Sequence, residues 1–156
     1  NYLWGKNVPH EPSLRVPLII SGPFLRNPNR FFDDPVSLLD MVATFTDILE
    51  TGDLENSDGK SLKSILLDEK QLIKRYAVSG LGSWRAINDG VFKLVVGFDD
   101  TISYDQIQYG CFPTDISQLE RGLFDVKKDP FHQNNLSRNS EKTVDYLTSV
   151  LKTEIQ

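Results

Sequence analysis

The sequence has one cysteine, Cys111, among its 156 residues. One cysteine can form neither a disulfide within the chain nor a cysteine cluster for zinc. Long apolar stretches are also missing, because no run approaches the roughly 20 residues that a membrane-spanning helix needs. Basic residues are not in excess, since 17 lysines and arginines stand against 22 acidic residues, a net charge of −5. These absences argue against a disulfide-stapled domain, a membrane span and a protein that tracks nucleic-acid phosphates.

Several catalytic signatures are missing too. The sequence contains no Gly-rich phosphate loop, no Gly-x-Ser-x-Gly elbow and no His-Glu-x-x-His zinc helix. The chain begins at Asn1 with neither an initiator methionine nor a signal-peptide pattern, so we expect it to be a piece of a longer protein. Its cellular compartment stays open. What is present, 39% hydrophobic and 25% charged residues, is typical of globular domains.

The first 75 residues have the pattern of an α/β unit. Residues 16–21 form a short apolar run that ends at a Gly-Pro turn, which predicts a strand buried on both faces of a parallel sheet. Asp34 and Pro35 predict the start of a helix, whose apolar residues recur at helical spacing up to a stop near Gly52. We therefore interpret residues 1–75 as the end of an α/β catalytic domain.

Residues 76–156 have a different pattern, with short strand-like runs and one terminal helix. An Asn-Asp-Gly sequence at 88–90 predicts a tight hairpin between two of the runs. A final amphipathic helix is predicted to begin near residue 139 or 140. Antiparallel strands with one terminal helix make an α+β subdomain. The predicted strands are residues 76–79, 84–87, 91–96 and 123–126.

Lys6 and His10 are the candidate functional residues near the start of the chain. Lys6 follows Gly5, which lets the backbone approach closely, and its ammonium could bind an anionic group. The alternative is a solvated surface lysine. His10 could act as a general acid or base, and its alternative is a packed or exposed imidazole. The residue types alone do not choose between these interpretations.

Other polar residues favour structural interpretations. Glu11 and Arg15, four residues apart, are expected to pair with each other or with the edge of the sheet. His132 follows an Asp-Pro turn and is expected at the surface. Asp99 and Asp100 have no third ligand nearby, which favours a turn over a metal site.

Five segments form an ordered series over nearly the whole chain. They are residues 3–20 (LWGKNVPHEPSLRVPLII), 35–40 (PVSLLD), 58–62 (DGKSL), 84–94 (WRAI and FKL) and 123–136 (LFDVKKDP and NL). In this order they resemble the C-terminal portion of the type I sulfatases of the alkaline phosphatase superfamily. The resemblance implies an α/β fold: the last sheet strand and helix of the catalytic domain, followed by a small antiparallel sheet with a terminal helix.

The resemblance implies that the full-length protein is a sulfuric ester hydrolase. In that family a formylglycine attacks sulfur, a calcium ion neutralises the sulfate oxygens, and the lysine of the Gly-Lys segment contacts the sulfate and assists the leaving oxygen. Lys6 matches that lysine, so it is the implied catalytic and substrate-binding residue, in keeping with charge stabilisation by a fixed ammonium. His10 replaces the usual aromatic residue before the glutamate and is a second candidate for substrate binding.

The nucleophile and the calcium ligands are expected upstream of Asn1, so this chain alone is expected to be inactive, and no metal ligand is assigned in it. Cys111 lies in a Cys-Phe-Pro-Thr-Asp sequence, where Asp115 replaces the arginine of the Cys-x-Pro-x-Arg element that is oxidised to formylglycine. We therefore interpret Cys111 as a structural or incidental thiol.

The implied substrate is a sulfated small molecule or glycan, and the implied protein partner is the rest of the same catalytic domain. Neither nucleic acid nor a membrane is expected as a partner. Two other functions stay open: a phosphonate or phosphodiester hydrolase of the same superfamily, and a non-catalytic binding or assembly module.

Overall fold

The computed structural model describes residues 7–52, 57–67, 75–98, 116 and 119–155. The chain divides into two compact units, residues 18–75 and residues 1–17 together with 76–156. Residues 7–17 therefore pack with the second half of the chain. That residues 1–75 end a catalytic domain and 76–156 form a C-terminal subdomain stays a prediction. No described helix is long and apolar enough to cross a bilayer.

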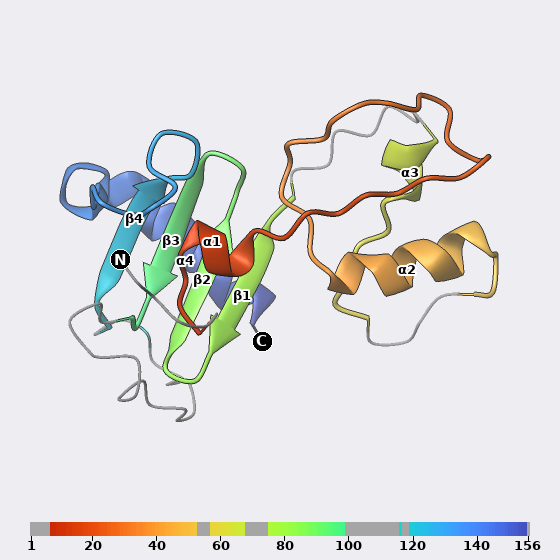
Figure 1. Ribbon diagram of the computed structural model, residues 1–156. Coiled ribbons are helices and arrows are strands. Elements are labelled where there is room, and N and C mark those ends of the chain that lie inside the picture. Colours follow the sequence, from red (N-terminus) through yellow and green to blue (C-terminus); the bar gives the residue numbers. More distant parts are fainter. Residues whose placement is uncertain (1–6, 53–56, 68–74, 99–115, 117–118, 156) are drawn as a thin grey trace. The chain divides into compact units, whose positions relative to one another are not determined.

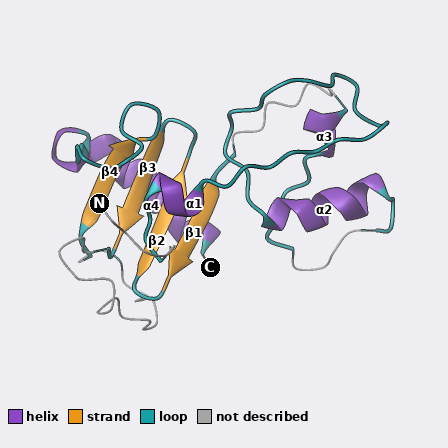
Figure 2. Cartoon of the chain, in the orientation of Figure 1, coloured by secondary structure: helices purple, strands orange, loops and turns teal. Residues whose placement is uncertain are grey.

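The unit that contains the C-terminus is built on a four-stranded antiparallel sheet (Figures 1 and 2). The strands follow one another in chain order, and each pairs with the next. This small sheet with a terminal helix confirms the predicted fold class. The strands are β1 (Ala77–Leu81), β2 (Trp84–Asn88), β3 (Phe92–Val96) and β4 (Arg121–Asp125).

The predicted hairpin joins β2 to β3. Gly90 has a φ of 90°, which a residue with a side chain rarely adopts. The carboxylate of Asp89 accepts hydrogen bonds from the backbone nitrogens of Val91 and Phe92, at 3.0 and 2.8 Å. The predicted turn therefore forms: Gly90 supplies the positive φ, and Asp89 contributes hydrogen bonds to the loop rather than a positive φ of its own.

The two faces of the sheet are covered by different parts of the chain. On one face Ile87, Leu94 and Leu123 pack against the terminal helix α4 (Glu141–Glu154), whose Leu147 and Leu151 are fully buried. Trp84, Ala86 and Val95 line the opposite face, where Leu14 packs against them from the short helix α1 (Glu11–Leu14). Figure 1 shows α1 and α4 on opposite sides of the sheet.

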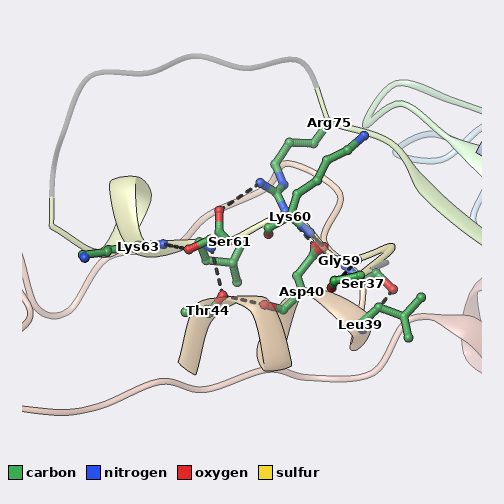
Figure 3. Close-up of polar contacts among 11 residues, drawn as sticks. Ser37, Leu39, Asp40, Thr44, Gly59, Lys60, Ser61, Lys63 and Arg75 are labelled. Atoms are coloured by element: carbon green, nitrogen blue, oxygen red, sulfur yellow. Dashed lines mark hydrogen bonds and ion pairs between the residues drawn. The ribbon is translucent and has the colours of Figure 1, made fainter. Parts of the chain in front are cut away.

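The other unit holds helix α2 (Leu39–Ile48) and the short helix α3 (Lys63–Leu66). Asp40 connects α2 to the rest of this unit (Figure 3). Its carboxylate pairs with Arg75 at 2.7 Å, with both side chains buried, and accepts hydrogen bonds from the backbone nitrogens of Ser37 and Lys60, each at 2.8 Å. Arg75 also donates to the carbonyl of Lys60 at 2.7 Å. A buried charge is tolerated when it is paired and hydrogen-bonded in this way.

The DGKSL segment, residues 58–62, docks on α2. A side chain at Gly59 would overlap the backbone carbonyl of Leu39, so glycine allows the close approach. The backbone nitrogen of Leu62 donates to the hydroxyl of Thr44 at 2.9 Å, and the Leu62 side chain is buried. This motif therefore has a structural role.

The predicted strand at residues 16–21 is not formed. The described sheet does not include this segment, and its apolar side chains face solvent, with Ile19 89% exposed. A strand needs neighbouring strands to satisfy its backbone groups. The apolar run alone could not supply them.

Helix α2 also differs from the prediction. It begins at Leu39, whereas Pro35 was predicted as its first residue. The residues it buries are the polar Asp40 and Thr44, whereas Val42 and Phe45, on the predicted apolar stripe, are each 54% exposed. The polar network around Asp40 occupies the inner side of α2, so the apolar stripe faces outward.

Candidate functional site

Lys6 lies outside the described residues, so its proposed role stays a prediction. Cys111, Asp99 and Asp100 also lie outside them, and their interpretations are not tested. The structure does describe the segment that follows Lys6, beginning at Asn7 and including His10.

The segment directly after Lys6 is attached to the sheet at several points. The indole nitrogen of Trp84 donates to the carbonyl of Asn7 at 3.2 Å. The ammonium of Lys93 donates to the carbonyl of Pro9 at 3.2 Å and forms an ion pair with Glu11. Helix α1 then begins, with the carbonyl of His10 accepting its first hydrogen bonds. Residues 7–14 are therefore held against the face of the sheet that carries Trp84.

The Glu11–Lys93 pair is buried, with side-chain exposures of 9% and 3%. Glu11 thus pairs with β3, an inner strand of the sheet, whereas the expected partners were Arg15 and the edge of the sheet. Burial lowers the pKa of Lys93, while the hydrogen bond and the charge of Glu11 oppose that shift. In the sequence, the signal was a lysine inside the apolar run VFKLVV, because a buried lysine needs a partner.

His10 and His132 meet at a small pocket in the same unit. Their ring centroids are 5.1 Å apart, and the ring of Phe98 lies nearly perpendicular to that of His10, with centroids 5.8 Å apart. His132 also stacks on Phe124, with centroids 4.3 Å apart and an interplanar angle of 8°. The pocket has a volume of about 90 Å³. It is lined by Pro9, His10, Val95, Phe98, Glu120, Arg121, Gly122, Phe124, His132 and Asn135.

The expectation that His132 lies at the surface is wrong, because its ring is half-buried between Phe124 and His10. Burial, followed by the charges of Lys93 and His10, lowers the pKa of His132 to about 3, and Asp129 opposes the shift. Its Nε2 is buried without a hydrogen-bond partner among the described residues. The imidazole of His132 is therefore neutral at neutral pH.

The Asp-Pro turn explains how His132 reaches this position. The Asp129 carboxylate accepts hydrogen bonds from the backbone nitrogens of Gln133 and Asn134, at 2.8 and 2.7 Å. Within this loop His132 has a φ of 55°, a left-handed conformation. The sequence predicted the turn, but nothing in it indicated that His132 would point inward.

Chemically, the pocket offers the imidazoles of His10 and His132 to a polar group. No group of three or more metal-ligating side chains exists among the described residues, so the described part of the chain provides no metal centre. Whether His10 binds substrate is not tested by this geometry and stays a prediction.

No protein-family model matches the chain. An arylsulfatase of Clostridium perfringens (strain 13 / Type A) is 27% identical over 156 residues, which cover 97% of this chain and 30% of the relative. The chain therefore spans about a third of the length of the curated relative it matches.

Solved structures give the same picture for the fold. A 2-O GAG sulfatase matches with a TM-score of 0.62 at 20% identity, covering 86% of this chain and 28% of the other. A protein solved in complex with its substrate D-glucosamine-2-N,6-O-disulfate matches with a TM-score of 0.52 at 20% identity, covering 74% of this chain and 23% of the other. The ordered motifs, the sequence likeness along the chain and these structures together confirm the resemblance, and the chain has the fold of the C-terminal part of the sulfatases.

Proposed function

We propose that this chain is the C-terminal part of a sulfatase that hydrolyses sulfate esters. The observation that carries the proposal is the likeness to an arylsulfatase along 97% of the chain. Because the chain spans 30% of that relative, the activity belongs to the longer protein and not to this part alone.

The proposed substrate is a sulfated glycan. The support is that one structural neighbour is a GAG sulfatase and another holds a disulfated glucosamine as its substrate. At 20% identity such neighbours support the fold, so the substrate class is an extension that needs its own assay.

Lys6 and His10 are the residues of this chain that we propose to act on the substrate. The ammonium of Lys6 would stabilise the negative charge that develops on the leaving oxygen. His10 would contact the substrate from the segment that follows. The pocket at His10 supports this role, since it leaves space beside the imidazole.

A calcium ion and a formylglycine belong to the proposal for the whole protein. The described residues hold no group of three or more metal ligands, so they do not fit a calcium site. Any such ligands, and the nucleophile, would come from outside the part of the chain described.

The remaining polypeptide of the catalytic domain is the proposed protein partner. Of the buried hydrophobic side chains among the described residues, Leu62 is the single one that lies in the unit of residues 18–75. Phe31, Leu49 and Phe45 of this unit are 100%, 69% and 54% exposed. An apolar surface of this kind is typical of an interface.

The test of the activity uses the full-length protein and three substrates: an aryl sulfate, a sulfated glucosamine and an aryl phosphodiester. We expect hydrolysis of the sulfate esters, and a fall in kcat of about a hundredfold or more for Lys6→Ala. Lys142→Ala, an exposed lysine on α4, is the matched control and should retain full activity.

Three results would contradict parts of this proposal. Faster cleavage of the phosphodiester would favour the related hydrolase reaction. Unchanged turnover in Lys6→Ala would remove the catalytic role of that residue. No hydrolysis of any substrate, with glycan binding retained, would favour a non-catalytic module.

A further inference from the structure

Lys93 stands out because it is a buried charge on an otherwise apolar strand. Alternation along β3 places Phe92, Leu94 and Val96 toward α4, and Lys93 with Val95 toward the opposite face. Lys93 is 2% exposed there. A buried ion pair contributes little net stability compared with apolar side chains of the same volume. Stability alone therefore does not explain a lysine at this position.

The contacts of Lys93 indicate another role. Its ammonium binds the carbonyl of Pro9 and the carboxylate of Glu11. These two residues are the immediate neighbours of His10 in the chain. One side chain of the sheet thus holds the backbone carbonyl of Pro9 and the carboxylate of Glu11, one on each side of His10. The imidazole itself lies against Phe98 and His132.

We propose that Lys93 is a positioning residue that, through Pro9 and Glu11, fixes His10 in the orientation that contacts the substrate. This inference rests on the proposed function, since it assigns a purpose to the placement of His10. Lys93 acts from behind the segment and does not itself contact the substrate.

The kinetic test is a double-mutant cycle in the full-length protein with a sulfate ester as substrate. Loss of one contact predicts a rise in KM of about tenfold for His10→Ala, with kcat changed by less than about threefold. Lys93→Met should give a similar rise. If Lys93 acts through His10, the double variant should show the same KM as His10→Ala, because no positioned imidazole is left to lose.

Two further variants make the cycle interpretable. Lys93→Met leaves Glu11 as an unpaired buried charge, which can prevent folding. The combination of Glu11→Gln with Lys93→Met removes both charges and serves as the second positioning variant. Lys128→Met changes a lysine whose side chain is 87% exposed and should leave KM unchanged.

Amide hydrogen exchange in the chain itself gives a readout that needs no activity. The amides of Ser13 and Leu14 donate to the carbonyl of His10, at 2.9 and 3.2 Å. Both should exchange at least about tenfold faster in the Glu11→Gln/Lys93→Met chain, because the ion pair that holds the first residue of α1 to the sheet is lost. Unchanged exchange would overturn the positioning role even if the protein is inactive.

The kinetic outcomes separate this inference from the proposed function. If the two tenfold effects are independent, the KM of the double variant should rise about a hundredfold. That result would overturn the inference and leave the sulfatase activity intact. An unchanged KM in His10→Ala would also overturn it. Absence of sulfate-ester hydrolysis in the unmodified protein would instead overturn the proposed function.

Discussion

His132 is held in a conformation and an environment that its sequence neighbours do not reveal. Its φ is 55°, its ring stacks on Phe124, and its pKa is lowered to about 3, with burial as the largest cause. The folded protein therefore keeps this imidazole neutral over a pH range where an exposed histidine, with a pKa of about 6.5, binds a proton.

This shift predicts a pH-dependent stability. Between pH 6.5 and 3 the unfolded chain binds more protons at His132 than the folded chain, so stability falls as the pH is lowered through that window. Between pH 7 and 5 we expect a loss of about 1–2 kcal/mol in the free energy of unfolding, measured by urea unfolding of the chain.

His132→Asn is the matched variant for this prediction. Asparagine adopts positive φ more readily than most residues and does not titrate in this range. The variant should lose less free energy of unfolding between pH 7 and 5 than the wild type. Above pH 7 the difference in free energy of unfolding between the two proteins should be constant. Equal pH profiles for the two proteins would show that another group carries the effect.

At the scale of the elements, the sequence predicted those helices and turns that a local residue pattern determines. The Asn-Asp-Gly sequence at 88–90 predicted the β2–β3 hairpin, and the spacing of apolar residues from Val144 onward predicted the buried face of α4. Residues 16–21 and α2 were different, because their apolar side chains indicate burial but not what buries them. The histidine pocket was missed for a related reason, since it joins His10 to a residue more than a hundred positions away.

The outward stripe of α2 leads to a prediction about Phe45. In the chain alone, Phe45→Asp should change the free energy of unfolding by less than about 0.5 kcal/mol, since the side chain is already 54% exposed. In the full-length protein the same change should cost about 2–4 kcal/mol, because an interface would lose a phenylalanine and bury a charge. Denaturant unfolding of both proteins measures the two costs.

Phe131 offers a matched control for that comparison. It is a phenylalanine of similar exposure, 59%, but it lies in the Asp-Pro loop rather than on α2. Phe131→Asp should have a small effect in both proteins. A large cost of Phe45→Asp in the chain alone would mean that the chain itself covers the stripe.

At the scale of the whole molecule, the two units differ in what holds them together. The unit of residues 1–17 and 76–156 has a hydrophobic core between sheet and α4 and a second cluster around Trp84. The unit of residues 18–75 relies on the buried Asp40–Arg75 pair and its backbone partners, with Leu62 as its buried hydrophobic side chain among the described residues. The first unit has the hydrophobic core of an independently folding domain, and the described part of the second unit does not.

This difference predicts that residues 18–75 can be removed without unfolding the first unit. Both ends of the excised segment, Pro17 and Tyr76, belong to that unit. A flexible Gly/Ser linker of roughly ten residues should therefore allow the sheet to form. Dispersed amide signals for β1–β4 in a two-dimensional NMR spectrum would agree, whereas a spectrum of an unfolded chain would show that the unit needs residues 18–75.

The Glu11–Lys93 pair has a consequence for synthesis on the ribosome. Its partners are 82 residues apart in the chain. At 5–20 residues per second, roughly 4 to 16 s pass between the emergence of Glu11 and that of Lys93. During this interval residues 7–14 have no sheet to bind. All of residues 18–75 emerge before the first strand of the sheet, β1, is made. The nascent chain must therefore keep residues 7–14 available until a strand made much later arrives to bind them.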